Sequence, residues 1–185
     1  MAEQSTMKMA LGTPAPNFSL TDTDANTITT SAAAGPRGLL VAFICNHCPY
    51  VKHVQHALAQ VVAEFQALGV GAVGISSNDV ETHPEDGPEM MAKEKADVGY
   101  SFPYVYDETQ EVARAYGAAC TPDFFLFDGD LLLVYRGRMD ATRPNSGDKA
   151  TGDELRAALQ ALVQGTEVST DQRPSVGCSI KWKSA

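Results

Sequence analysis

The feature that most constrains this fold is a change of hydrophobic pattern at two cysteines. Residues 39–44 form a short apolar run typical of a buried β-strand, and a Gly-Pro-Arg-Gly segment at residues 35–38 precedes it. Across residues 49–68, apolar side chains recur at three- and four-residue intervals, and Gly69 follows as a helix-ending residue. A Cys-Asn-His-Cys segment at residues 45–48 joins the two patterns. The sequence therefore predicts a strand, a CxxC motif and a helix in that order.

This position gives the two cysteines a specific chemistry. Unpaired N–H groups and the positive end of the helix dipole favour a thiolate at a helix N-terminus. The thiolate is the nucleophilic form, and the CxxC spacing lets the sulfurs form a disulfide that can be exchanged with a partner. We expect Cys45 to attack and Cys48 to resolve. The alternative is a structural zinc half-site, but the sequence contains no second CxxC.

The rest of the chain has the pattern of an α/β sheet. Asp128-Gly129 between apolar runs predicts a two-residue hairpin turn. Thr151 with Glu154 predicts a capping box for the last helix, and Asp107 is a candidate cap for the helix predicted over residues 108–116. The predicted strands are residues 17–22, 27–29, 39–44, 70–76, 102–106, 123–127 and 130–135, and the predicted helices are residues 49–68, 88–98, 108–116 and 151–163.

The length and the net charge of the chain limit its domain organisation and the classes of partner that it can bind. The 185 residues suit one domain, which we place at residues 11–165, with a flexible tail at residues 1–10 and an extension at residues 166–185 that packs on the same domain. The net charge of -9 argues against nucleic acid and anionic membranes as partners.

The expected location is the cytoplasm. No stretch approaches the ~20 apolar residues that span a bilayer, and residues 1–10 lack the apolar segment of a secretory signal. In that compartment, four cysteines indicate catalysis or redox sensing rather than a disulfide framework. No pattern in the sequence calls for a cofactor.

Several segments together resemble a known family. The order of strand, CxxC helix, strand, Thr-Pro, hairpin and terminal helix resembles the thioredoxin fold, and GTPAPNFSL at residues 12–20 resembles the opening of its redoxin branch, the alkyl hydroperoxide reductase/thiol-specific antioxidant superfamily. CNHCPYVK, CTPDFF and PSVGCSIKW, at residues 45–52, 120–125 and 174–182, resemble bacterial proteins described as thiol-disulfide oxidoreductases. The resemblance implies a central mixed sheet flanked by helices, with an N-terminal β-hairpin and a redoxin-type insertion.

The resemblance also implies roles for individual residues. Cys45 would be the nucleophile and Cys48 the resolving cysteine. Pro122 would follow a cis peptide bond beside the sulfurs. The backbone of Thr121 would pair with an extended substrate segment, and its hydroxyl could donate to the Cys45 sulfur.

The chain departs from the family pattern around the motif. Ile44 replaces the tryptophan that usually precedes the first cysteine, and the strand before it carries no acid to accept a proton from Cys48. We expect Asn46 and His47, between the cysteines, to tune the site, because a protonated histidine would stabilise a Cys45 thiolate. Asp123 is a candidate proton acceptor. The alternative for His47 is a solvent-facing loop residue.

Two further cysteines are candidate accessory thiols. Cys120 lies two residues before Pro122, and Cys178 lies in the tail after the last helix. They could pair with each other, take over a disulfide from Cys48, or remain semi-buried free thiols.

The sequence favours a thiol-disulfide oxidoreductase that exchanges its disulfide with a protein or small-thiol substrate and is reduced by an unidentified thiol. One alternative is a copper or zinc carrier that uses Cys45, Cys48 and either His53 or His56, and another is a binding module that recognises a partner through Cys45. Peroxide reduction is less favoured, because peroxiredoxins carry threonine or serine three residues before the reactive cysteine, where this chain has Ala42.

Overall fold

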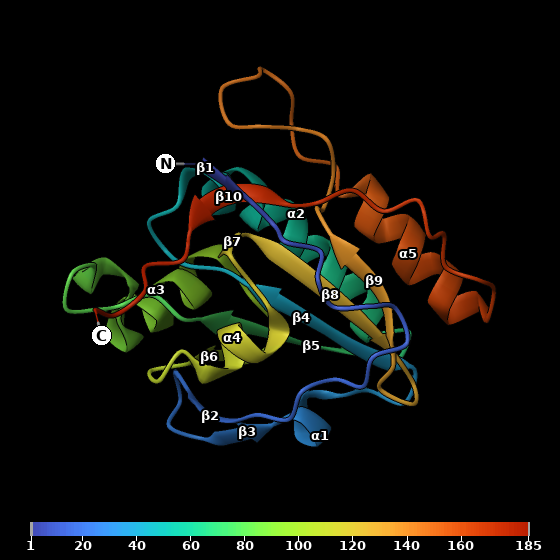
Figure 1. Ribbon diagram of the computed structural model, residues 1–185, viewed down its shortest axis with the longest axis horizontal. Coiled ribbons are helices and arrows are strands. Elements are labelled where there is room, and N and C mark those ends of the chain that lie inside the picture. The colour runs from blue at the N-terminus through green and yellow to red at the C-terminus, as the bar shows by residue number, and fades with distance from the viewer. Residues whose placement is uncertain (1, 185) are drawn as a thin grey trace.

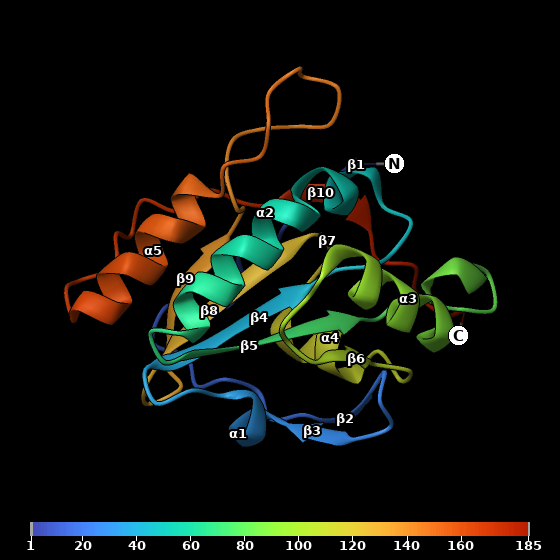
Figure 2. The ribbon, with the colours of Figure 1, turned by 180° about the vertical axis from the view of Figure 1, so that it is seen from behind.

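The main β-sheet lies at the centre of the molecule, with helices on both faces (Figure 1, Figure 2). The computed structural model describes residues 2–184. Two hydrogen-bonded groups of strands, β3-β2-β6-β5 and β4-β8-β9, lie side by side, and the Ile44 amide donates to the Ile75 carbonyl at 3.0 Å where they meet. β5 and β6 run parallel and the other pairs within these groups run antiparallel, so the sheet is mixed. The strands are β2 (Ser19–Asp22), β3 (Thr27–Thr29), β4 (Gly38–Phe43), β5 (Val70–Ser76), β6 (Tyr104–Tyr106), β8 (Asp123–Asp128) and β9 (Leu133–Gly137).

Strand β4 separates two hydrophobic cores, and all of its residues are buried. Leu40 and Ala42 pack into one core. Leu39, Val41 and Phe43 pack into the other, as the two-residue period of a strand requires. The first core is covered by α2 (Pro49–Gln66), α3 (Pro88–Val98) and α5 (Asp153–Gln164), and the second by α1 (Thr30–Ala33) and α4 (Glu111–Tyr116).

Local signals define the helices α2 and α3. Pro49 opens α2 at the first helical position, where its missing N–H costs no hydrogen bond. Gly69 follows α2 with φ of +91°, and Gly99 ends α3 with φ of +80°, a conformation that favours glycine. The prediction of α3 is confirmed, and α2 begins at Pro49 as predicted but ends at Gln66, with Ala67 rather than Gly69 as its C-cap. Within residues 2–184, none of the helices is both long and apolar enough to cross a membrane.

The predicted hairpin turn and the predicted cap of the last helix, α5, are both wrong in detail. The Asp128 side chain accepts from the amides of Asp130 and Leu132, so the hairpin has a longer turn than a two-residue Asp-Gly one. The predicted capping box of Thr151 and Glu154 does not form: Gly152 precedes α5, and the first-turn amide of Leu155 donates to the Met139 carbonyl at 3.1 Å. The Asp140 carboxylate holds the segment before the helix by accepting from the Gly152 amide at 2.7 Å.

The helix α4 is shorter than predicted and starts at Glu111. Asp107 still serves its first turn, since its carboxylate accepts from the Ala113 amide at 2.9 Å. The residue that precedes the helix is Gln110, which adopts a left-handed conformation. Asp107 therefore accepts a hydrogen bond from the first turn of α4, although it is separated from the helix by the turn that ends at Gln110.

A second, smaller sheet has the strand order β1-β10-β7, with β1 (Ala2–Gln4), β10 (Val176–Ser179) and β7 (Cys120–Thr121). Residues 1–10 were predicted to form a flexible tail, but Ala2–Gln4 forms β1, because the free edge of β10 offers it backbone partners. Met1 lies outside the described residues. The C-terminal segment packs on the domain, and Ile180 is only 3% exposed. This small sheet lies next to the CxxC segment.

Candidate active site

The two cysteines of the motif lie where β4 ends and α2 begins. Cys45 follows the strand, and Cys48 is the N-cap of the helix. The Cys45 sulfur hydrogen-bonds with the Thr121 hydroxyl at 3.3 Å, and the Cys48 thiol donates to the Thr121 carbonyl at 3.3 Å. The Thr121–Pro122 peptide bond is cis. The structure thus brings together the four residues that the sequence placed at the centre of the site.

Both sulfurs are covered in this structure, since Cys45 is 1% exposed and Cys48 is 0% exposed. The cysteines are free thiols. The pKa of Cys48 is lowered to about 5, first because the Cys45 thiol donates a hydrogen bond to it, with further help from Cys178 and the Val51 amide. The pKa of Cys45 is raised, first because it holds the proton shared with Cys48, and also through burial and the charge of Asp86. The sequence predicted Cys45 as the attacking thiol, whereas the lowered pKa belongs to Cys48 at the helix N-cap.

A buried carboxylate that the sequence analysis missed holds the loop between the cysteines. Asp86 ends the short 3-10 helix η1 (Pro84–Asp86) and is 0% exposed. One carboxylate oxygen accepts from the amides of Asn46 at 2.8 Å and His47 at 3.1 Å. The other accepts from the Asn78 side chain at 2.8 Å and lies 2.5 Å from Nδ1 of His47. Asp86 lies in a polar loop with no periodic pattern, so no local signal distinguished it from neighbouring acids.

The two residues between the cysteines differ in their surroundings. Asn46 is 6% exposed, accepts from the Tyr104 hydroxyl at 3.0 Å and donates to the Glu85 carbonyl at 3.0 Å. The His47 ring is partly exposed and stacks on His83 with ring centroids 5.1 Å apart. Asn46 therefore ties the loop to the sheet, and His47 is held between Asp86 and a second imidazole rather than free in solvent.

Asp123 is fully buried on β8, directly after Pro122. Burial raises the pKa of its carboxyl to about 7. Its charge contributes to raising the pKa of Cys120, after the larger effect of burial. A carboxyl with this pKa can take up and release a proton near neutral pH.

The accessory cysteines lie on neighbouring strands but on opposite faces. In the antiparallel register, Cys178 is opposite Thr121, and Ser179 is opposite Cys120. Successive residues of a strand point to opposite faces, so the geometry does not support a Cys120–Cys178 disulfide. Cys178 instead lies close to Cys48, since its side chain and backbone help to lower the pKa of the Cys48 thiol.

The metal-carrier alternative required His53 or His56 near the cysteines. His53 hydrogen-bonds with the Thr142 hydroxyl at 2.8 Å, and His56 is exposed. Among residues 2–184, the side chains with suitable atoms within 4.8 Å of one another are Cys45, His47 and Asp86 instead. The predicted ligand set is therefore not brought together.

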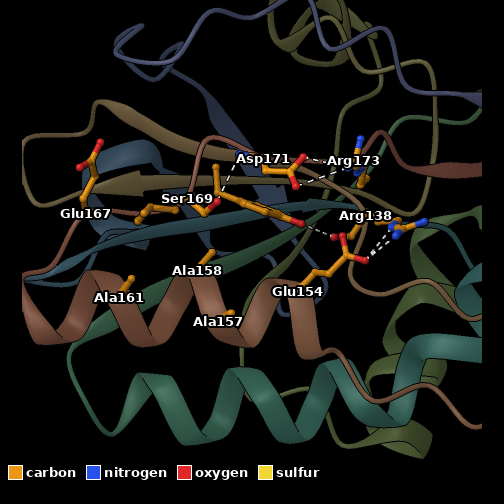
Figure 3. A pocket seen from close by; sticks show the side chains of 11 residues that line it. Arg138, Glu154, Ala157, Ala158, Ala161, Glu167, Ser169, Asp171 and Arg173 are labelled. Carbon is orange, nitrogen blue, oxygen red and sulfur yellow. Dashed lines mark hydrogen bonds and ion pairs between the residues drawn. The ribbon is translucent and has the colours of Figure 1, made fainter.

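A cavity of about 440 Å³ lies away from the cysteines, between α5 and residues 167–173 (Figure 3). Small side chains of α5 face it, among them Ala157, Ala158 and Ala161, and the Arg138–Glu154 ion pair closes one end. No cysteine lines this cavity. The cavity is therefore separate from the CxxC segment.

Comparison with known proteins identifies the family. Residues 11–136 match the model of the AhpC/TSA family. Proteins from two strains of Mycobacterium tuberculosis, provisionally named peroxiredoxins, are 27% identical over 113 residues, which are 61% of this chain and 67% of theirs.

Solved structures agree with this assignment. An uncharacterized conserved protein from Geobacillus kaustophilus is 52% identical with a TM-score of 0.97, covering 100% of this chain and 98% of its own. A hypothetical protein from Sinorhizobium meliloti is 45% identical with a TM-score of 0.95, covering 98% and 99%. A secreted disulfide oxidoreductase from Mycobacterium tuberculosis, homologous to DsbE of E. coli, is 17% identical with a TM-score of 0.59 over 78% and 95%, and shares the fold. The expected family and fold are confirmed: the chain belongs to the AhpC/TSA family of thioredoxin-like redoxins.

Proposed function

We propose that this protein is a thiol-disulfide oxidoreductase that exchanges a Cys45–Cys48 disulfide with a protein or small-thiol substrate. One observation carries the proposal: at the N-terminus of α2, the sulfurs of both cysteines hydrogen-bond with Thr121. A shared proton and a lowered pKa at Cys48 keep one thiolate available in the pair at neutral pH.

The exchange has two steps. When the shared proton resides on Cys48, Cys45 is the thiolate and attacks the substrate disulfide, which releases one substrate thiolate and forms a mixed disulfide. Cys48 then loses its proton and attacks the Cys45 sulfur, which releases the second substrate thiolate and closes the Cys45–Cys48 disulfide. The Thr121 hydroxyl stabilises the Cys45 thiolate, and an external thiol returns the pair to its reduced form.

Peroxide reduction is the second candidate, because the Mycobacterium tuberculosis relatives carry the peroxiredoxin name. Three residues before Cys45 lies Ala42, which is 2% exposed and carries no hydroxyl to bind a peroxide. We therefore expect disulfide substrates to be turned over faster than hydroperoxides. The cytoplasmic location predicted from the sequence stays a prediction.

The decisive experiment is redox titration with residue mapping. The protein is equilibrated in glutathione buffers of graded potential, free thiols are alkylated, and each cysteine is identified by mass spectrometry. We expect a Cys45–Cys48 linked peptide to form in one two-electron step, while Cys120 stays labelled. A midpoint near or below about -230 mV would mark a reductant, and one near about -120 mV an oxidant.

Two serine variants separate the roles of the sulfurs. Cys48→Ser should accumulate a mixed disulfide with substrate at Cys45, whereas Cys45→Ser should not accumulate one at Cys48. The reverse pattern would exchange the two roles. Turnover of hydroperoxide faster than of any disulfide, with Cys120→Ser as a matched control, would contradict the proposal.

A further inference from the structure

The chain's own C-terminal strand occupies the edge of the site. β10 pairs with β7, and Cys178 is opposite Thr121 in the register. The resemblance to thioredoxin-like proteins implies that an extended substrate segment would pair with this same edge. In the structure, β10 therefore takes the place expected for a substrate strand and carries a cysteine in it.

The fit between β10 and the residues before the cis-proline is close. A Cβ atom at Gly177 would lie 1.9 Å from the Thr121 carbonyl oxygen, so only glycine allows this approach. The same carbonyl accepts the hydrogen bond of the Cys48 thiol. Gly177 thereby brings the next residue, Cys178, next to Cys48.

Three observations connect Cys178 with the pair. Its side chain packs against the core cluster that contains Cys45 and Cys48. Its side chain and backbone lie close enough to Cys48 to lower the pKa of that thiol. It is also partly exposed, whereas Cys45, Cys48 and Cys120 are buried. Cys178 is thus the most exposed of the four cysteines and lies close to the buried Cys48.

We propose that Cys178 is a third redox-active thiol, which takes over the disulfide from the buried pair and presents it at the surface. The inference rests on the proposed function, since the Cys45–Cys48 disulfide is its starting point. The Cys178 thiolate attacks the Cys48 sulfur, a Cys48–Cys178 bond forms, and the Cys45–Cys48 bond breaks with Cys45 as leaving thiolate. The proton that Cys178 loses is balanced by the one that Cys45 gains, and no external oxidant is needed.

The charges of the site favour this step in the oxidised protein. In the reduced protein, the pKa of Cys178 is raised to about 12, first by burial and then by its hydrogen bond to Cys48 and the charge on Cys48. A Cys48 sulfur in a disulfide carries no charge, so the two latter causes disappear. The positive charge of Lys181, which lowers the pKa of Cys178, remains. Oxidation of the pair therefore makes Cys178 more acidic and a better nucleophile.

The first test uses the variant Cys45→Ser, which retains Cys48 and Cys178. After treatment with diamide, we expect a Cys48–Cys178 linked peptide in the digest and the loss of both alkylation labels. The matched variant Cys45→Ser/Cys120→Ser should form the same bond, and Cys45→Ser/Cys178→Ser should not. Full labelling of Cys48 and Cys178, or a bond from Cys48 to Cys120, would overturn the proposal.

The second test uses the protein with all four cysteines. Oxidised protein should contain both Cys45–Cys48 and Cys48–Cys178 linked peptides, and Cys178→Ser should react with external glutathione on the order of tenfold more slowly, because its disulfide stays buried. An unchanged rate would overturn the proposal. If the Cys45–Cys48 disulfide never forms, the proposed function fails; if it forms without any Cys48–Cys178 bond, only the role of Cys178 fails.

Discussion

At the scale of single residues, the buried carboxylate of Asp86 organises the loop between the cysteines. It accepts from the backbone amides of Asn46 and His47 and from the Asn78 side chain, and it contacts the His47 ring. A buried N–H group without a partner costs free energy, so this one side chain keeps the loop in place. The geometry of the sulfurs therefore depends on an acid from a distant part of the chain.

Replacing Asp86 separates its charge from its hydrogen bonds. Asp86→Ala leaves two amides of the loop without an acceptor, and we expect the free energy of unfolding to fall by about 3 kcal/mol. Asp86→Asn keeps one acceptor oxygen and should lose clearly less. Urea denaturation of both variants measures the difference. Equal losses for alanine and asparagine would show that the amide contacts contribute little.

Asp123 predicts a pH dependence of stability. Its folded pKa of about 7 lies above the ordinary value of 3.8. The protonated carboxyl therefore stabilises the folded protein fully below about pH 3.8, and this stabilisation is lost as the pH rises to about 7. Over this range the free energy of unfolding falls by on the order of 4 kcal/mol. Asp123→Asn should be more stable than the parent at pH 8 and gain little at pH 4. Urea titrations at both values test this, and a constant difference would contradict it.

At the scale of elements, the predictable parts are those whose signals are local. The periodic apolar residues and the flanking Pro49 and Gly69 predict α2 well, since each acts within its own turn. The capping box predicted for α5 was wrong, because the Met139 carbonyl, which accepts from the first-turn amide of Leu155, lies outside the local sequence pattern of the helix. Likewise, Asn46 and His47 could be located from the motif, but Asp86 could not, because tertiary contacts alone distinguish it.

The position of β10 depends on one glycine. Gly177→Ala would place a methyl group against the Thr121 carbonyl and push the strand away from β7. We expect a loss of stability of about 2 kcal/mol and faster alkylation of Cys48 in the reduced protein. Gly129→Ala, at an exposed turn glycine outside the left-handed region whose Cβ would lie 3.3 Å or more from other atoms, is the control for glycine replacement in general. Unchanged alkylation of Cys48 in Gly177→Ala would contradict this account of the strand.

At the scale of the whole molecule, the fold determines where the cysteines lie, and the net negative charge determines which charged substrates are attracted to them. The central sheet positions the cysteines, as the sequence predicted, whereas the pairing of β1 with β10 could not be predicted, because β1 is short and fully exposed in its side chains. The net charge of -9 creates a field that acts on every charged substrate approaching the site.

This field predicts a preference among small disulfides. At low ionic strength, we expect the reduced protein to react several-fold faster with cystamine, which is cationic, than with oxidised glutathione, which is anionic. Added salt should reduce the difference, because the screening length falls to about 8 Å at 0.15 M. Stopped-flow rates at two salt concentrations measure it. A difference that does not respond to salt would assign the preference to direct contacts instead.

The pairing of β10 with β7 and β1 also bears on how the protein folds. These pairs join segments that are far apart in the chain, and such contacts form late, because closing a long loop costs entropy before any contact is gained. The helix α2 needs only neighbouring residues and can form earlier. A folding chain should therefore pass through a stage in which Cys45 and Cys48 are already adjacent but not yet covered, so an oxidant present during refolding meets two sulfurs that the finished fold hides.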